Sequence, residues 1–505
     1  MLKIKKEGRL RKIMEFKHKE VIIFVAVMFV FYLLTLSCSW DDEDGILFIR
    51  GVREFNVAKW QPHPPGYPVY IFLGKISVFL IGEELLGLTI LSAIFGALSL
   101  VVFYFLIFEM YDKKTALMAT MLMAVTPMFW LNSLKAMTDM VGLFFILLSM
   151  YFIHHSIKYK ELKSLYIGSF VSAIAVGVRF HALFVVAPLL VYSCFKMKNN
   201  AETKNKHFKK KTLFIFFVGV LIWLIPTLIA SGFLGYFESA SRQFFKRFDP
   251  GFAVVGGGVS PDYLALTMKD FFKFFLGSGY GIDFWGFKML PVVALLFYLF
   301  FLLLSYEKLK DKRILFFVVG LFFYLIMVIL FLPLSNPRYF LPLIPFISLL
   351  FALGISWFGR FDYLAFIFLL FLLIFSSVPL VKGIHGEAAP PVKLVEYIEE
   401  NYDLDEIIIF RDAMIGRHLK YYNLSSYLPI DLGRYLSNES ISDQDPIDRS
   451  KTISAVFDKD KTILIIDPYY NTFKNYNITL IETFERDVRI HAKHSSIQLY
   501  ELNAS

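Results

Sequence analysis

The chain contains 505 residues, of which 57% are hydrophobic, 18% aromatic and only 19% charged. Soluble domains carry about a quarter charged residues, so these proportions exclude a water-soluble enzyme, a disordered chain and a collagen-like chain. The two cysteines, Cys38 and Cys194, lie in apolar runs, which excludes a disulfide scaffold, CxxC chemistry and a zinc site built on cysteine. The formal charge of +9 raises the question of where the positive residues lie.

The basic residues cluster in short islands between apolar runs, at 3–19, 113–114, 158–163, 196–211, 308–313 and 360. The positive-inside rule places all of these islands in the cytoplasm. The first apolar run, 21–39, is followed by Trp40 and four acids rather than by a small-residue cleavage site. We therefore interpret residues 1–20 as a basic cytoplasmic N-terminus and the run as an uncleaved first span.

The apolar runs predict an all-α polytopic membrane domain, residues 21–382, with about 11 transmembrane helices of near ~20 residues each. The short pair 163–178 and 180–195 turns around Arg179 on the outer side. The segment Tyr67–Ile81 carries Lys75 and would break the inside–outside alternation, so it is predicted to be an interfacial helix on the outer leaflet. The predicted spans are 21–39, 86–109, 114–131, 138–157, 163–178, 180–195, 212–231, 289–305, 314–333, 339–356 and 362–381.

Three regions then lie outside the cell: an external loop 40–84, a long loop 231–288 and the tail 383–505. The tail is polar, and its apolar runs alternate between helix-like and strand-like patterns. This alternation predicts a small extracytoplasmic α/β domain. Its expected helices are 392–401 and 412–422, and its expected strands are 406–410, a stretch near Tyr427, 462–467, 478–484 and 497–502.

The external loop 40–84 is the most informative part of the chain. It begins with the acids Asp41, Asp42, Glu43 and Asp44 and continues to the sequence Gln-Pro-His-Pro-Pro-Gly-Tyr-Pro at 61–68. An acidic cluster alone is typical of a solvated cap on a membrane span. The prolines, however, fix a rigid turn that no span requires. That turn holds His63 and Tyr67 beside the acids, which makes the loop a candidate site.

This loop resembles the first external loop of the GT-C superfamily, membrane glycosyltransferases that use polyprenyl-phosphate sugars, and especially its protein O-mannosyltransferase-like members. Further similarities follow in chain order, and a polar C-terminal domain completes them. The similar segments are Pro-Met-Phe-Trp at 127–130, Thr-Asp at 138–139, Gly-Val-Arg at 177–179 and Asn-Pro-Arg-Tyr-Phe-Leu-Pro-Leu-Ile-Pro at 336–345.

The resemblance implies that an aspartate of this loop removes the proton of the acceptor hydroxyl. Counting back from 55–58 places Asp44, followed by Gly45, at that position, with Asp42 as the second choice because acids also stand directly upstream. The donor phosphate needs cations at the outer leaflet, and Arg179 and Arg338, followed by Tyr339, stand at outer ends of spans. Each arginine could equally snorkel to lipid headgroups.

Three further residues have competing interpretations. Lys135 and Asp139 are four apart, so they would share one face of the fourth span if its helix starts that early. They would then form a helix-end ion pair or orient the acceptor. His63 would bind phosphate or sugar, or would only support the turn.

The resulting hypothesis is an inverting hexosyltransferase of the plasma membrane. It would move a mannose-like sugar from a polyprenyl-phosphate donor to a protein, glycolipid or surface-polymer hydroxyl on the outer face. The reaction requires no cofactor, and no His/Cys/carboxylate set has metal-ligand spacing, so a divalent metal has no support. Membrane lipids are expected partners and nucleic acid is not, since the basic islands fit the cytoplasmic membrane surface. The alternatives are a lipid-linked-sugar flippase and a non-catalytic envelope scaffold.

Overall fold

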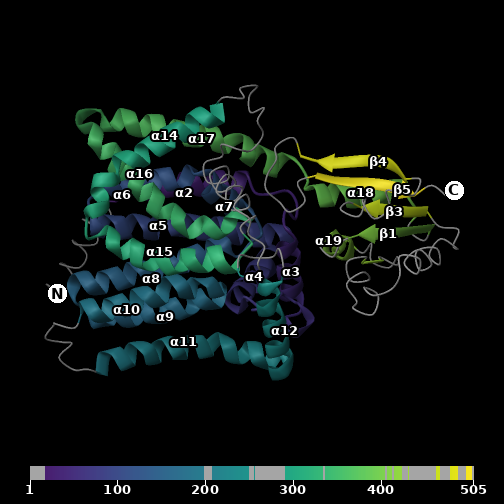
Figure 1. Cartoon of the computed structure of the whole chain (residues 1–505), viewed down its shortest axis with the longest axis horizontal. Helices are drawn as coiled ribbons and strands as arrows, with labels where there is room; N and C mark the ends of the chain where they lie inside the picture. The colour runs from purple at the N-terminus through teal and green to yellow at the C-terminus, as the bar shows by residue number, and fades with distance from the viewer. Residues whose placement is uncertain are drawn as a thin grey trace. The chain divides into compact units, whose positions relative to one another are not determined.

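The computed structural model describes residues 18–197, 207–249, 255, 290–333, 336–403, 406–411, 415–422, 430–431, 462–466, 478–486 and 496–502. Residue contacts divide the chain into two compact units (Figure 1). The membrane unit comprises Met1–Leu36 and Phe48–Lys382, and the C-terminal unit comprises Ser37–Leu47 and Gly383–Ser505.

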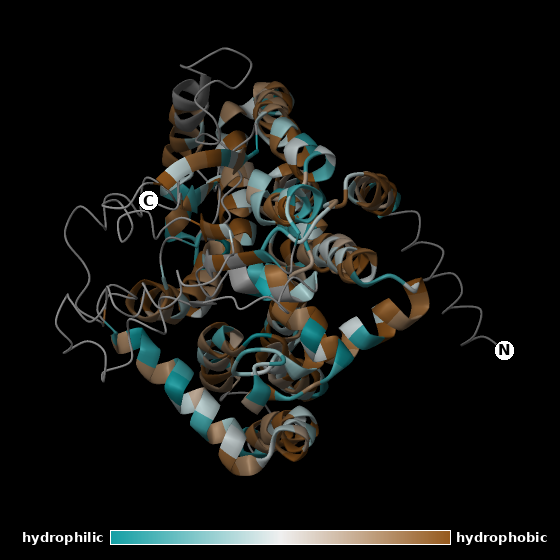
Figure 2. Cartoon of the chain, turned by 90° about the vertical axis from the view of Figure 1, so that its right-hand side faces the viewer, coloured by the Kyte–Doolittle hydropathy of each residue, from teal (hydrophilic) through white to brown (hydrophobic). Residues whose placement is uncertain are grey.

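The membrane unit is built of helices whose residues are mostly hydrophobic (Figure 2). Within the described residues, five helices are long and apolar enough to cross a bilayer, or six if one bent pair counts as a span. The predicted polytopic helical protein is confirmed, while the number of eleven crossings stays a prediction. The helices are α2 (Lys19–Leu34), α3 (Glu43–Arg53), α4 (Pro68–Ile81), α5 (Glu84–Met110), α6 (Lys113–Val125), α7 (Pro127–Leu134), α8 (Asp139–Tyr159), α9 (Leu162–Val178), α10 (Leu183–Lys196), α11 (His207–Ser231), α12 (Phe233–Phe245), α14 (Leu290–Leu304), α15 (Ile314–Phe331), α16 (Ile344–Ile355) and α17 (Asp362–Gly386).

Three local predictions need correction. The expected span 114–131 is two helices, α6 and α7, bent by 60° at a break before Pro127, because proline disfavours helical backbone at the residue preceding it. Lys135 follows the end of α7 and α8 begins only at Asp139, so these two residues do not share a helix face. The two expected loops, 40–84 and 231–288, contain the helices α3 and α12.

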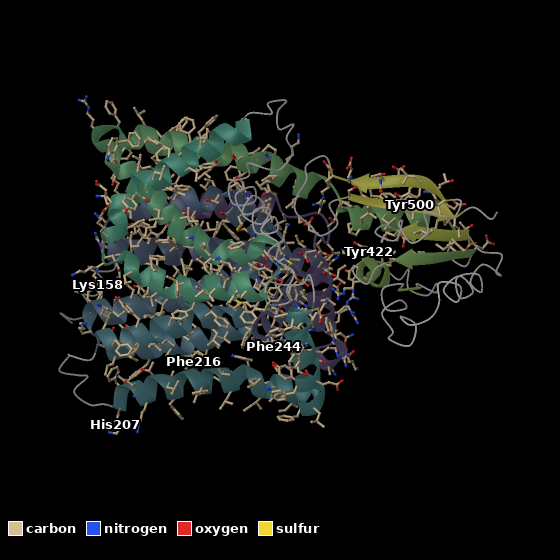
Figure 3. The ribbon with its side chains drawn as sticks, in the orientation of Figure 1. Lys158, His207, Phe216, Phe244, Tyr422 and Tyr500 are labelled. Carbon is tan, nitrogen blue, oxygen red and sulfur yellow. The ribbon has the colours of Figure 1, made fainter. Side chains whose placement is uncertain are left out.

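One end of the membrane unit carries basic side chains that cap a helix. Lys158 and Arg313 donate hydrogen bonds to the carbonyls of Glu109 and Met110, at 2.5 and 2.8 Å, at the C-terminus of α5. Cations are favoured there because the last carbonyls of a helix carry partial negative charge. Figure 3 shows Lys158 and His207 at this end of the unit, with Phe244 toward the other.

The C-terminal unit contains a five-stranded mixed sheet of order β2-β1-β3-β5-β4. The strands β1 (Ile407–Arg411), β2 (Ile430–Asp431) and β3 (Thr462–Ile466) are parallel, while β4 (Ile478–Glu485) and β5 (Ser496–Leu502) are antiparallel. The helices α18 (Pro390–Asn401) and α19 (Ile415–Tyr421) join its elements. The predicted α/β pattern is confirmed, although Tyr427 lies outside the described residues.

The proline-rich turn is fixed by local contacts within the membrane unit. The backbones of Asn56 and Gln61 form a two-way bridge at 2.7 and 3.0 Å around the short helix η1 (Val57–Lys59). Gly66 donates its N–H to the His63 carbonyl at 3.0 Å and has φ of +100°, a conformation that L-residues rarely adopt. A Cβ atom on Gly66 would stand 2.6 Å from Cγ2 of the buried Val57. Two constraints therefore require glycine here.

We expect Gly66→Ala to lower the free energy of unfolding more than Gly82→Ala does, by about 1–3 kcal/mol, the usual cost of overpacking. Gly82 also has positive φ, +81°, but a Cβ there would meet nothing within 4 Å. The matched pair therefore separates backbone strain from the clash with Val57. The measurement is denaturant unfolding of both variants in detergent micelles, and equal losses would contradict the expectation.

Candidate active site

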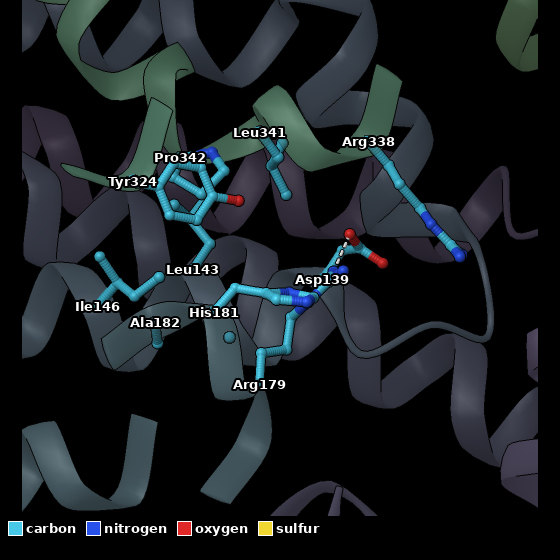
Figure 4. Close-up of a pocket in the computed structure, with 11 residues that line it drawn as sticks. Asp139, Leu143, Ile146, Arg179, His181, Ala182, Tyr324, Arg338, Leu341 and Pro342 are labelled. Atoms are coloured by element: carbon cyan, nitrogen blue, oxygen red, sulfur yellow. Dashed lines mark hydrogen bonds and ion pairs between the residues drawn. The ribbon is translucent and has the colours of Figure 1, made fainter. Parts of the chain in front are cut away.

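A polar pocket in the membrane unit is formed by four segments that are distant in the sequence (Figure 4). The start of α8, the turn between α9 and α10, the middle of α15 and the 3₁₀ helix η8 (Pro337–Leu343) contribute its lining. Among the residues that the structure describes, the lining contains the guanidinium groups of Arg179 and Arg338 and the carboxylate of Asp139. The residues are Asp139, Gly142, Leu143, Ile146, Arg179, His181, Ala182, Tyr324, Arg338, Leu341 and Pro342.

The carboxylate, Asp139, forms an ion pair with Arg179. Asp139 is the first residue of α8, where the helix dipole favours a negative charge, and Arg179 ends α9. Gly142 makes the approach possible, because a Cβ atom there would lie 3.0 Å from Cδ of Arg179. The side chain of Asp139 is only 1% exposed and that of Arg179 only 13%. This is a buried ion pair, and the second carboxylate oxygen of Asp139 has no hydrogen-bond partner among the described residues.

The second guanidinium, Arg338, is brought to the same pocket by η8. The guanidinium carbons of Arg338 and Arg179 lie 5.7 and 5.8 Å from the centroid of the Tyr339 ring, a distance at which cations are attracted to an aromatic face. The Tyr324 hydroxyl donates to the Tyr339 carbonyl at 2.6 Å and so fixes η8 against α15. Both guanidinium groups therefore lie beside the same aromatic ring, and a guanidinium is well suited to bind a phosphate or carboxylate through two parallel hydrogen bonds.

Sequence reasoning did not select His181 and Tyr324. His181 packs edge-on against Tyr339, with ring centroids 5.8 Å apart, and its Nδ1 has no hydrogen-bond partner within the described part of the chain. Its position two residues after Arg179 was a signal that could have found it. Tyr324 lies within an apolar run and carried no such signal.

His63 and Tyr67 lie near this pocket without lining it, since Tyr67 interacts electrostatically with Arg179 and His63 with His181. They are hydrogen-bonded to each other at 2.8 Å and pack against Phe48, with both residues under 10% exposed. Neither lines the pocket, and neither does Lys135, whose backbone joins α7 to α8. Whether His63 binds phosphate or sugar, or only supports the turn, stays a prediction.

The acid cluster belongs to the C-terminal unit. Asp41 pairs with Arg486 at 2.6 Å and Glu43 pairs with Arg417, so two of the four negative charges face arginines. Asp42 accepts a hydrogen bond from the Asp44 N–H at 3.0 Å, as the residue before a helix does. Asp44 is half-buried in the first turn of α3.

A metal centre has no donor set in the part of the chain that the structure describes. No group of three or more His, Cys, Asp or Glu side chains there could hold a metal ion.

Comparison with known proteins identifies the fold. Residues 62–229 match the dolichyl-phosphate-mannose-protein mannosyltransferase family. Apo ArnT from Cupriavidus metallidurans has a similar structure, with a TM-score of 0.55 and 11% identity over 96% of this chain and 98% of that one. The chain has the GT-C fold. The Archaeoglobus fulgidus oligosaccharyltransferase, tethered to an acceptor peptide containing the NVT sequon, also resembles this GT-C chain, with a TM-score of 0.51 and 14% identity over 90% of this chain and 69% of that one.

The family match covers part of the candidate site, and the structural matches cover different shares of the similar proteins. The family match includes Asp139, Arg179 and His181 but neither Asp44 nor Arg338. The chain spans 62% of the Archaeoglobus oligosaccharyltransferase in its complex with zinc and sulfate. No curated protein matches the sequence significantly. A second structure of the Cupriavidus ArnT has undecaprenyl phosphate bound.

We expect Asp139→Asn to lower the free energy of unfolding by about 3–5 kcal/mol, because Arg179 would keep its charge in a buried site without its carboxylate partner. The control is Glu238→Gln, which breaks the exposed pair with Arg242, whose side chains are 71% and 70% exposed. That change should cost about 0.5 kcal/mol or less. Denaturant unfolding in micelles measures both, and a similar small loss in the two variants would disprove the buried pair.

Proposed function

We propose that the chain is a glycosyltransferase that moves one sugar from a polyprenyl-phosphate donor to a hydroxyl acceptor on the outer face of the membrane. The observation that carries the proposal is that Arg179 and Arg338, which come from segments distant in the sequence, line the same pocket. The match to dolichyl-phosphate-mannose-protein mannosyltransferases favours a mannose-like hexose as the sugar. The ArnT relative that binds undecaprenyl phosphate supports the same class of donor.

The pocket supplies what departure of a polyprenyl phosphate requires. When the glycosidic bond breaks, the phosphate oxygen gains negative charge, and fixed cations in a site of low dielectric stabilise that charge strongly. Arg338 is the proposed main phosphate ligand, because a guanidinium can donate two parallel hydrogen bonds to phosphate oxygens. Arg179, held in place by Asp139, would add positive potential without having to rearrange.

The geometry of α8 supports an external site. Asp139 is its first residue and Lys158 lies in its last turn. A helix of 21 residues is about 30 Å long, near the thickness of a bilayer core. The pocket would thus lie on the side of the membrane opposite Lys158, whose basic cluster the positive-inside rule assigns to the cytoplasm. The proposed location is the plasma membrane, with the C-terminal unit outside.

Asp44 is the proposed general base. It would take the proton of the acceptor hydroxyl as the oxygen attacks the anomeric carbon from the side opposite the phosphate, so the configuration inverts. Protein, glycolipid or surface polymer remain the candidate acceptors, and the C-terminal unit would help to bind them. A flippase or an envelope scaffold are the competing functions.

We expect Asp44→Asn to reduce kcat for sugar transfer by about 10²–10⁴, the range that a general base supplies. The assay uses protein in native lipid with a labelled polyprenyl-phosphate sugar. The matched control is Asp42→Asn, because asparagine caps a helix as well as aspartate does. Its kcat should stay within a few-fold of wild type.

The same assay separates the alternatives. Transfer that survives in Asp44→Asn but is lost in Asp42→Asn would move the base to Asp42. Absence of transfer by the wild type with every lipid-linked sugar, together with movement of the lipid across the bilayer, would favour the flippase. Absence of both activities would favour the scaffold.

We expect Arg338→Gln to weaken binding of undecaprenyl phosphate by about 10- to 100-fold, since a hydrogen bond to a charged group contributes about 1.5–3 kcal/mol. Calorimetric titration in lipid nanodiscs measures the Kd. Arg242→Gln serves as the control for loss of one positive charge, because Arg242 is exposed and does not line the pocket. Equal affinities for Arg338→Gln and wild type would remove Arg338 from the donor site.

A further inference from the structure

The segment that carries the acid cluster packs with the C-terminal unit, although it stands almost 350 residues earlier in the sequence. Residue contacts group Ser37–Leu47 with Gly383–Ser505. Two arginines of that unit, from two different elements, contact the acids. This arrangement raises the question of what the arginines do for the proposed base.

Arg486, which follows β4, contacts the segment at two residues. Its Nη1 lies 2.6 Å from Oδ1 of Asp41, its Nη2 donates to Oγ of Ser39 at 3.2 Å, and its Nε donates to the Ala388 carbonyl at 3.1 Å. The side chains of Arg486 and Asp41 are 5% and 3% exposed. Ser37 completes the network, since its hydroxyl donates to the Ser39 carbonyl and to Asp41. Arg486 thus fixes the chain three to five residues before Asp44.

Helix α19 contacts the segment through other atoms. Arg417 pairs with Glu43, the residue directly before Asp44. His418 Nε2 donates to the Trp40 carbonyl at 3.4 Å, and the Trp40 ring packs edge-on against Tyr421 with centroids 5.3 Å apart. The segment is therefore anchored on both sides of Asp42, which in turn caps the first turn of α3.

We propose that Arg486 and Arg417 are positioning residues: they hold Asp41 and Glu43 so that the carboxylate of Asp44 is presented in one fixed orientation for proton transfer. This inference rests on the proposed function. It assigns the C-terminal unit a role in the transfer step besides acceptor binding. A general base misplaced by about 1 Å loses a large part of its rate advantage, so the anchors should affect turnover and not donor affinity.

The test begins with the paired variant Asp41→Leu/Arg486→Met in the full-length protein. It removes both buried charges together, a change that often leaves stability intact where removal of one partner does not. We expect kcat for sugar transfer to fall at least tenfold, while the Kd for undecaprenyl phosphate and the KM for the donor stay within about twofold of wild type. The single variant Arg486→Lys keeps a positive charge opposite Asp41. Its kcat should therefore lie between that of the paired variant and that of wild type.

A second variant, Arg417→Gln, acts at the other anchor, where the arginine side chain is 25% exposed. If the paired variant does not fold, the kcat of Arg417→Gln decides the test. The control is Glu400→Gln, which neutralises an exposed charge near the end of α18 in the same unit. Its kcat should equal that of wild type.

Combination with Asp44→Asn distinguishes positioning from general structural support. If the arginines act through Asp44, the paired variant should cause no further loss of kcat in the Asp44→Asn background, since residues that act as a unit are not additive. Full additivity, or wild-type kcat in the folded paired variant and in Arg417→Gln, would overturn the inference. Absence of transfer by the wild type itself would instead overturn the proposed function.

Discussion

The high cost of a charge without a partner in a low-dielectric environment organises this protein. The bilayer core accepts almost no ionised side chains, so ionised residues gather at the ends of the helices. There Lys158 and Arg313 satisfy the last carbonyls of α5. The same rule acts inside the membrane unit. Arg179 is tolerated in a buried position because Asp139 stands opposite it at a helix N-terminus.

The general architecture was predictable because it follows from residue-by-residue hydrophobicity. Apolar runs between basic islands predicted the helices of the membrane unit, and the change to short alternating runs after residue 383 predicted the sheet. Local breaks were harder to predict. Pro127 marks the 60° bend between α6 and α7, but an apolar run on both sides looks like one span. The helix α3 was missed because its acidic first turn looks like a solvated loop until Asp42 is seen as its cap.

The candidate site was predicted in part for a physical reason. Arginines at helix ends stand out in an apolar sequence, so Arg179 and Arg338 could be selected, and the fold brings them together. His63 and Tyr67 also stood out, but they bond to each other. Which charged residues meet depends on tertiary packing, which no spacing rule gives. The partners of Asp41 and Glu43 illustrate this, since Arg486 and Arg417 lie in a tail that sequence reasoning treated as a separate domain.

The contact between Gly142 and Arg179 has an evolutionary consequence. The glycine leaves room for the stem of the arginine side chain, and a Cβ atom at position 142 would stand 3.0 Å from Cδ of Arg179. A larger residue at position 142 therefore requires the Arg179 side chain to shift, and this shift acts directly on its ion pair with Asp139. Positions 139, 142 and 179 are therefore expected to vary together. Among related sequences, a change at one of them should be accompanied by compensating changes at the other two, even where the surrounding apolar residues vary independently.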